Sequence, residues 1–175
     1  MFKKFFIILT LFLFSFSNNI KSKERSIMIM KLKYGEVKIE LFDDVAPNHV
    51  KRIKSLANSE KYDGVAFHRV IDGFMAQTGC PEGRGTGKSN YPNLPAEFNN
   101  EPHVRGVCSM ARSSMPNSAN SQFFICFKDA NFLDRQYTVW GKVIEGMEAV
   151  DKLERGEPPR NPDRMISVRV SSNPV

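Results

Sequence analysis

The sequence predicts a mainly β fold, a closed antiparallel β-barrel with two α-helices over its open ends. Short apolar stretches that alternate with polar residues recur along the chain, and turn residues separate them. Only two stretches show the apolar spacing of a helix. Without its first 17 residues, the 175-residue chain is still long enough for one domain with a sizeable core, and too short for two.

The N-terminus is typical of an export signal. Lys3 and Lys4 precede an apolar run over residues 5–16, and Ser15 and Ser17 offer a small-residue cleavage pattern. The run is shorter than the roughly 20 residues of a bilayer-spanning helix, so an uncleaved anchor is the weaker alternative. We therefore predict a signal peptide over residues 1–17, a linker over 18–26 and a folded domain over 27–172. The expected destination is a periplasm, with the secretory pathway or the extracellular space as alternatives.

The domain begins with a predicted hairpin and a helix. Residues 27–33 indicate a strand, and Tyr34-Gly35 turns the chain into a second strand over 36–41, where apolar and charged residues alternate. Pro47 suits the first turn of a helix. The apolar residues that follow repeat at helical spacing, and they are Val50, Ile53, Leu56 and Ala57.

A second hairpin is expected over residues 67–77, with Asp72-Gly73 as its turn. Phe67, Arg69 and Ile71 then share one face of the strand, so Arg69 lies on a largely apolar surface. An unpaired guanidinium is costly to bury there and needs polar partners or an open groove. Taken alone, the stretch favours an ordinary surface arginine.

Residues 78–100 are rich in Gly, Pro, Asn and Ser, which predicts a surface loop beside a groove. Part of this loop looks like a phosphate-binding motif. Only three residues separate Gly83 from Gly87-Lys88-Ser89, however, where that motif requires four, and no apolar helix follows. We therefore expect no nucleotide site.

The second half of the domain adds buried strands over residues 106–110 and 122–127. The loop between them consists of small and polar residues and suits backbone pairing with an extended ligand. Further strands are expected around Trp140 and over residues 166–170, and a second helix is expected over residues 145–153.

Charge and cysteine content argue against several function classes. The formal charge of +6 falls to +4 when Lys3 and Lys4 leave with the signal, and no basic run of five occurs, so no nucleic-acid partner is expected. The three cysteines and three histidines show no metal-ligand spacing, and we predict no metal. Cys108 and Cys126 fall in apolar stretches. Cys80, in the loop, is the cysteine expected to be open to oxidation or intermolecular pairing.

Several long motifs follow one another from about Met28 to Val170. They are Tyr34-Gly35-Glu36, Phe67 to Gln77, Gly106 to Arg112, Ser121 to Ile125 and Val139 to Met147. In sequence and order they resemble the cyclophilin family of peptidyl-prolyl cis–trans isomerases. The resemblance implies an eight-stranded barrel capped by two helices, and an isomerase of X-Pro bonds that needs no cofactor.

The resemblance also implies roles for individual residues. Arg69 matches the catalytic arginine, since a guanidinium donor at the nitrogen of a twisted amide opposes delocalisation of its lone pair. The implied substrate-binding residues are Phe74, Met75, Phe124 and Leu133 around the proline ring, Gln77 and Gln122 beside the arginine, Ala111 and Arg112 along the peptide backbone, and Phe132 and Tyr137.

Two of these positions depart from the family pattern. Phe132 precedes Leu133-Asp134 where many members carry Trp, and it lacks the indole N–H donor. The resemblance implies that this change weakens cyclosporin binding more than catalysis. Tyr137 stands where many members carry His, and its hydroxyl still donates and accepts.

We therefore expect a monomeric, exported isomerase that acts on proline-containing peptides and unfolded proteins, with no stable membrane insertion after signal cleavage. The alternative is a proline-peptide-binding holdase chaperone in which turnover is secondary, because the same groove serves both activities. A purely structural barrel is a third interpretation, and it requires an exposed apolar patch that the sequence does not reveal.

Overall fold

The computed structural model describes residues 25–171. The predicted signal peptide and most of the predicted linker lie outside the described residues. Within the described part of the chain, no helix has the length and apolar character needed to cross a membrane.

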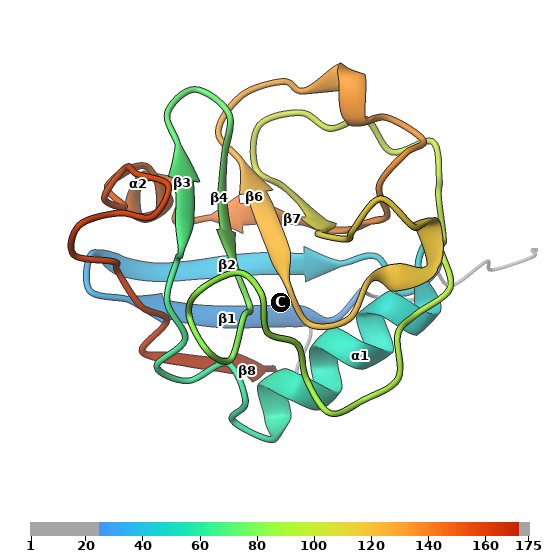
Figure 1. Ribbon diagram of the computed structural model, residues 1–175, viewed down its shortest axis with the longest axis horizontal. Helices are drawn as coiled ribbons and strands as arrows, with labels where there is room; N and C mark the ends of the chain where they lie inside the picture. Colours follow the sequence, from blue (N-terminus) through green and yellow to red (C-terminus); the bar gives the residue numbers. More distant parts are fainter. Residues whose placement is uncertain (1–24, 172–175) are drawn as a thin grey trace, which may run out of the picture.

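A single antiparallel sheet of eight strands forms the frame, in the order β3-β4-β6-β5-β7-β2-β1-β8. Its strands are β1 (Ile27–Leu32), β2 (Gly35–Leu41), β3 (Arg69–Ile71), β4 (Met75–Thr78), β5 (Val107–Met110), β6 (Phe123–Cys126), β7 (Val139–Glu145) and β8 (Ser167–Val170). In Figure 1, β3 and β4 run almost perpendicular to β1 and β2, because the sheet curls strongly. The mainly β class predicted from the sequence is confirmed.

The sheet is a curled half-barrel, whereas the sequence predicts a closed barrel. No ladder joins the edge strands β3 and β8 within the described residues. Isolated bridges, Ala66 to Arg164 and Val70 to Gly156, connect this edge to the segment before β8. That segment contains Pro158, Pro159 and Pro162. Proline has no N–H to donate, so a continuous ladder cannot form there.

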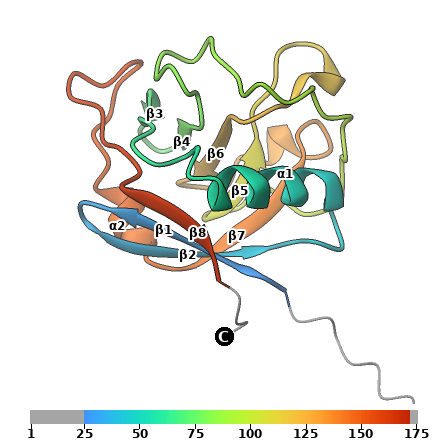
Figure 2. The same ribbon diagram turned by 90° about the horizontal axis from the view of Figure 1, so that it is seen from below.

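Two α-helices, α1 (Pro47–Asn58) and α2 (Met147–Asp151), lie on opposite sides of the molecule. The view from below in Figure 2 shows α1 packed across the opening of the curled sheet. As predicted, α1 buries Val50, Ile53, Leu56 and Ala57. It also buries Arg52, whose guanidinium donates to the backbone oxygens of Pro92 and Asn120 at 2.9 and 3.2 Å.

The second helix is shorter than predicted because β7 continues through Glu145 and Gly146 separates the two elements. Gly146 has φ +85°, and a Cβ there would lie 2.1 Å from the Glu36 backbone oxygen. A glycine is therefore required at this point, where the chain leaves the sheet and enters α2.

The core fills the inside of the curl. Trp140 is fully buried and meets Phe123 edge to face at 5.3 Å between ring centres, and Phe123 meets Tyr62 in the same way at 5.5 Å. Such aromatic contacts add about 0.5–1.5 kcal/mol each beyond burial of apolar area. This core supports β5, β6 and β7 from within, and these strands in turn support one side of the site.

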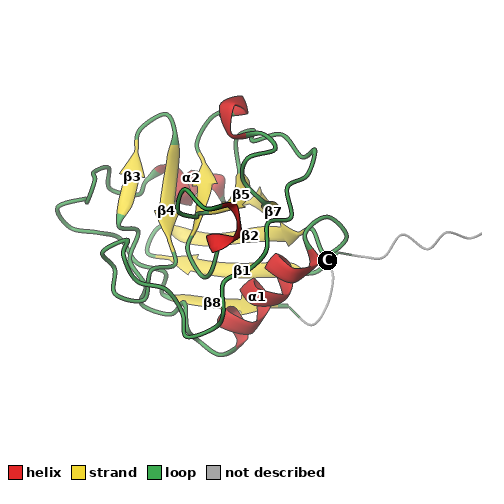
Figure 3. Ribbon diagram, turned by 45° about the vertical axis from the view of Figure 1, so that its right-hand side comes forward, coloured by secondary structure: helices red, strands yellow, loops and turns green. Residues whose placement is uncertain are grey.

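Residues 79–106 contain no helix or strand, form the light green to yellow-green loops of Figure 1, and belong to the segments drawn green as loops in Figure 3. The prediction that Cys80 is open to pairing is wrong, because Cys80 is fully buried at the base of this loop. Its Sγ accepts the N–H groups of Gly85 and Gly87 at 3.2 and 3.3 Å. All three cysteines are free and buried.

Candidate active site

Strand register aligns three of the predicted site residues in one row. Arg69 on β3 lies opposite Gln77 on β4, Gln77 lies opposite Phe124 on β6, and Phe124 lies opposite Ser109 on β5. Directly opposite residues of an antiparallel pair project to the same face of the sheet. The sheet itself therefore places a cation, an amide and an aromatic ring side by side.

This row borders a small cavity of about 150 Å³. The residues around the cavity are Arg69, Phe74, Met75, Gln77, Ala111, Arg112, Phe124, Leu133 and Tyr137. They are all the predicted site residues except Gln122 and Phe132. Phe132 is 67% exposed, and its ring lies 5.5 Å from that of Phe74, at the rim of the cavity. Six of the nine residues around the cavity are apolar or aromatic, so we call this the apolar cavity, and Arg69, Gln77 and Arg112 supply its charged and amide side chains.

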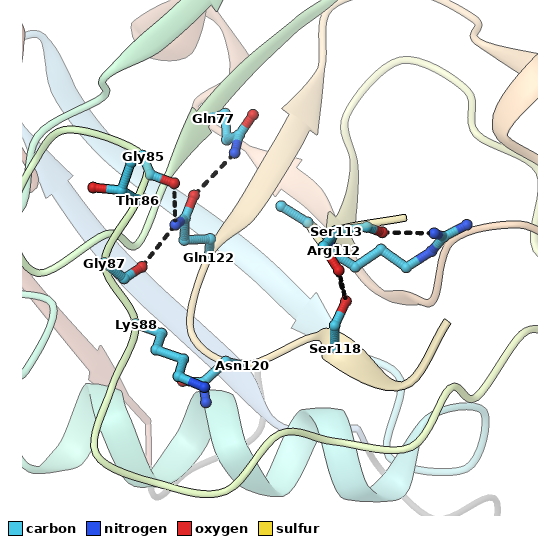
Figure 4. Close-up of a pocket in the computed structure, with 11 residues that line it drawn as sticks. Gln77, Gly85, Thr86, Gly87, Lys88, Arg112, Ser113, Ser118, Asn120 and Gln122 are labelled. Carbon is cyan, nitrogen blue, oxygen red and sulfur yellow. Dashed lines mark hydrogen bonds between the residues drawn. The ribbon is translucent and has the colours of Figure 1, made fainter. Parts of the chain in front are cut away.

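A second cavity of about 260 Å³, the polar cavity, is lined mainly by polar residues and glycines. It adjoins the first, and the two share Gln77, Ala111 and Arg112. Figure 4 shows Gln122 at its centre. The Gln122 amide nitrogen donates to the backbone oxygens of Gly85 and Gly87 at 2.9 and 2.8 Å, and its oxygen accepts from Gln77 at 3.0 Å. Gln122 therefore ties the glycine-rich loop to the sheet. The polar residues Thr86, Lys88, Ser113, Ser118 and Asn120 of this cavity are absent from the sequence prediction.

Arg112 lies at the border of both cavities and is held by backbone oxygens. Its Nε and Nη2 donate to the Gln136 carbonyl at 3.0 and 2.8 Å, and its guanidinium lies 4.5 Å from the Tyr137 ring centre. Tyr137 in turn meets Phe124 edge to face at 6.0 Å. Arg112 thus contributes a fixed cation and also holds one wall of the apolar cavity.

The side chain of Arg69 is 41% exposed, so the guanidinium stays in contact with solvent at the cavity edge. Its Nε donates to Oε2 of Glu157 at 2.8 Å. Glu157 is not among the predicted site residues. The sequence analysis requires a polar partner or an open groove for Arg69. The structure provides both, since Glu157 is the partner and the guanidinium is open to solvent.

A buried polar group supports the apolar cavity from behind. His103 is fully buried, and its ring stacks on Phe124 at 6.2 Å. Its Nδ1 lies 2.9 Å from Oδ1 of Asp134, and its Nε2 lies 3.0 Å from Oγ of Ser109. Burial lowers the pKa of His103 even though Asp134 opposes this. The ring thus joins Asp134 to Ser109, whose hydroxyl also donates to the Thr138 carbonyl at 3.0 Å, so Phe124 rests on a fixed surface.

The sequence prediction does not assign His103 and Ser109 to the site. The sequence contains one indication of such a partner. Asp134 ends the Phe-Leu-Asp motif, and a carboxylate beside an apolar stretch needs a polar partner such as His103. Its pKa is lowered because it accepts from the backbone N–H and the ring of His103. Across the described residues, no group of three or more His, Cys, Asp or Glu side chains is arranged to hold a metal ion.

Comparisons with known proteins agree with this geometry. A family model for cyclophilin type peptidyl-prolyl cis-trans isomerases matches residues 27–171. A probable peptidyl-prolyl cis-trans isomerase of Brucella suis is 53% identical over 162 residues, which is 83% of each chain. The peptidyl-prolyl cis-trans isomerase of Synechococcus elongatus is 40% identical over 144 residues, covering 81% of this chain and 94% of the relative.

Solved structures show the same relationship. The cyclophilin AquaCyp293 of Hirschia baltica superposes with a TM-score of 0.75 at 31% identity, covering 82% of this chain and 75% of the other. A cyclophilin type isomerase of Cryptosporidium parvum, crystallised in the presence of the dipeptide Ala-Pro, gives 0.77 at 29% identity and covers 84% and 99%.

The family match and the likeness to solved structures define the class of this protein, an enzyme that rotates the peptide bond before proline. The chain belongs to the cyclophilin-type peptidyl-prolyl cis–trans isomerases. It is a peptidyl-prolyl cis–trans isomerase, as the sequence predicts.

Proposed function

We propose that Arg69 is the catalytic residue of this isomerase and that the apolar cavity receives the proline ring. The X-Pro bond has a barrier near 18–20 kcal/mol, and it isomerises unaided in tens to hundreds of seconds. Shortening the isomerisation time from about 100 s to about 10 ms requires a rate acceleration of roughly 10⁴-fold. This corresponds to about 5.5 kcal/mol of tighter binding to the twisted amide than to the planar one. No bond breaks, so the reaction needs neither a nucleophile nor a metal.

The observation that carries this proposal is the position of the Arg69 guanidinium at the mouth of the apolar cavity. A proline ring against Phe124 and Met75 brings its nitrogen toward the side of the cavity where Arg69 lies. As the amide twists, the nitrogen regains its lone pair, and a guanidinium N–H that donates to it stabilises the twisted state more than the planar one. The polar cavity around Gln122 then holds the neighbouring part of the peptide.

Replacing Arg69 tests the proposal. In Arg69→Ala we expect kcat/KM for isomerisation of an Ala-Pro peptide to fall about 10²- to 10³-fold, the loss typical of removing one preorganised donor. Two-dimensional NMR exchange on the mature chain measures it. Peptide shifts should still titrate, because the apolar cavity remains. Full activity in Arg69→Ala would refute the mechanism. Suppression of client aggregation that survives the change would instead support the holdase alternative.

We further propose that the isomerase is exported, that it assists folding of proteins outside the cytoplasm, and that it acts as a monomer. The support for export is the basic, apolar and small-residue pattern of residues 1–17. Fractionation of the source cell with mass spectrometry of the isolated protein should recover, in the exported fraction, a chain that begins after Ser17. An intact Met1 in the membrane fraction would identify an anchor instead.

Cyclosporin binding is proposed to be weak. The support is Phe132 at the cavity rim, where it offers a ring without an N–H donor. The affinity of this chain for cyclosporin then depends on apolar contact alone at that point of the rim.

A further inference from the structure

Backbone register brings Glu157 to Arg69. Val70 N donates to the Gly156 oxygen and Gly156 N donates to the Val70 oxygen, both at 2.8 Å. In an antiparallel pair, the residue after Gly156 lies opposite the residue before Val70. Glu157 therefore faces Arg69 across this bridge, and the 2.8 Å contact between Nε and Oε2 follows from the register.

The segment that carries Glu157 is itself anchored to the hairpin of β3 and β4. The Arg155 guanidinium lies 4.3 Å from the Phe127 ring centre, and its Nε donates to Oδ1 of Asp72 at 3.1 Å. Its Nη1 donates to the backbone oxygens of Asp151 and Leu153 at 2.8 and 2.5 Å. Glu157 is thus presented from a fixed support.

The contact with Glu157 leaves the two Nη groups of Arg69 free to donate to a substrate. Among the described residues, Arg69 donates to protein through Nε, and neither Nη has a protein acceptor. Its other neighbour, Gln77, directs its amide to Gln122 instead. A guanidinium is a planar, rigid fork, so holding Nε from one side sets the direction in which both Nη groups point.

Stability does not explain this ion pair. The side chains of Arg69 and Glu157 are 41% and 52% exposed, and pairs at that exposure contribute little to folding. An arginine without a partner, by contrast, samples many rotamers, and each one that points away from the cavity is unproductive. The pair therefore matters for the orientation of Arg69.

We propose that Glu157 is a positioning residue, which holds the Arg69 guanidinium in the orientation that serves the twisted amide. The inference rests on the proposed catalytic role of Arg69. The proline-rich segment before β8 then takes part in the reaction, although none of its residues lines the apolar or the polar cavity.

Two substitutions at one position test this inference. In Glu157→Ala we expect kcat to fall about 3- to 10-fold, the loss expected when one rotamer-rich side chain is released, with KM changed less than about twofold. Glu157→Gln keeps an acceptor oxygen and should lie closer to wild type than to Glu157→Ala. The assay is NMR exchange on an Ala-Pro peptide with the mature chain.

A matched control and a double mutant separate positioning from general effects. Glu145 is 57% exposed and pairs with Lys38 at 2.7 Å away from both cavities, so Glu145→Ala should keep wild-type kcat. If Glu157 acts through Arg69, Glu157→Ala should cause no further loss in the Arg69→Ala background.

The outcomes are distinct. Wild-type kcat in Glu157→Ala, or an equal loss in both backgrounds, would overturn the positioning role while leaving a catalytic Arg69 intact. A Glu157→Gln variant as slow as Glu157→Ala would overturn it as well, because hydrogen-bond acceptance would then be irrelevant. Full activity in Arg69→Ala would refute the proposed function itself.

Discussion

Phe132 illustrates how one exposed side chain separates two properties of the same groove. Its ring is 67% exposed and contacts Phe74, so it extends the apolar rim without closing the cavity. Arg69, proposed to contact the reacting bond, and Phe124, proposed to contact the proline ring, lie on the sheet and do not depend on Phe132. Only ligands large enough to reach the rim therefore bind more weakly because Phe132 has no N–H donor.

Phe132→Trp should raise cyclosporin affinity. One added hydrogen bond is worth about 0.5–1.5 kcal/mol, which corresponds to roughly 2- to 12-fold in the dissociation constant. The kcat/KM for a short Ala-Pro peptide should change less than about twofold. Isothermal titration with cyclosporin beside the exchange assay measures both.

Phe132→Leu is the control, because it shortens the apolar rim and adds no donor. An affinity for cyclosporin that is unchanged by Phe132→Trp would show that the rim donor is not what limits binding in this chain.

At the scale of elements, the sequence predicts those parts of the molecule whose signal is local. Alternation locates the hairpin of β3 and β4, and the spacing of Val50, Ile53 and Leu56 locates α1. The boundary of α2 is misplaced because the apolar spacing around it also fits a helix over Glu145. The boundary is fixed by a steric demand from a distant strand, because a Cβ added at Gly146 would lie 2.1 Å from the Glu36 backbone oxygen on β2.

The same limit applies to the site. Motif resemblance predicts Arg69, Gln77 and Phe124 as site residues, and strand register places them in one row. Glu157 cannot be found in this way, since its pairing with Arg69 depends on a two-residue bridge that leaves no periodic pattern in the sequence. The sequence does not predict the role of His103 for a related reason, because only the fold brings His103 next to Ser109.

At the scale of the whole molecule, the fold buries all three histidines. His49 and His103 are fully buried and His68 is 6% exposed. Burial lowers the pKa of each one, with the Glu97 and Asp134 carboxylates opposing the shift at His49 and His103. The folded protein therefore keeps all three rings neutral at a pH where the unfolded chain, with histidine pKa values near 6.5, already binds protons.

This difference predicts that stability falls as the pH falls below about 6.5. The folded pKa lies below the unfolded pKa, so the contribution is complete above 6.5 and is lost progressively as the pH drops toward the folded values. Each histidine then costs up to about 1.4 kcal/mol of unfolding free energy per pH unit. Urea unfolding of the mature chain at pH 7.5 and 5.5 should give a clearly lower free energy of unfolding at pH 5.5.

His68 provides the discriminating variant. Neither of its ring nitrogens makes a well-formed hydrogen bond among the described residues, although the Ala66 backbone and the Gln122 side chain oppose the lowering of its pKa. His68→Phe therefore removes a titrating group and gives up only these weak polar contacts. The variant should unfold at a higher urea concentration than wild type at pH 5.5, and its free energy of unfolding should depend less steeply on pH, by about one proton. Equal stability of the wild type at both pH values would mean that the buried rings already take up protons in the folded state.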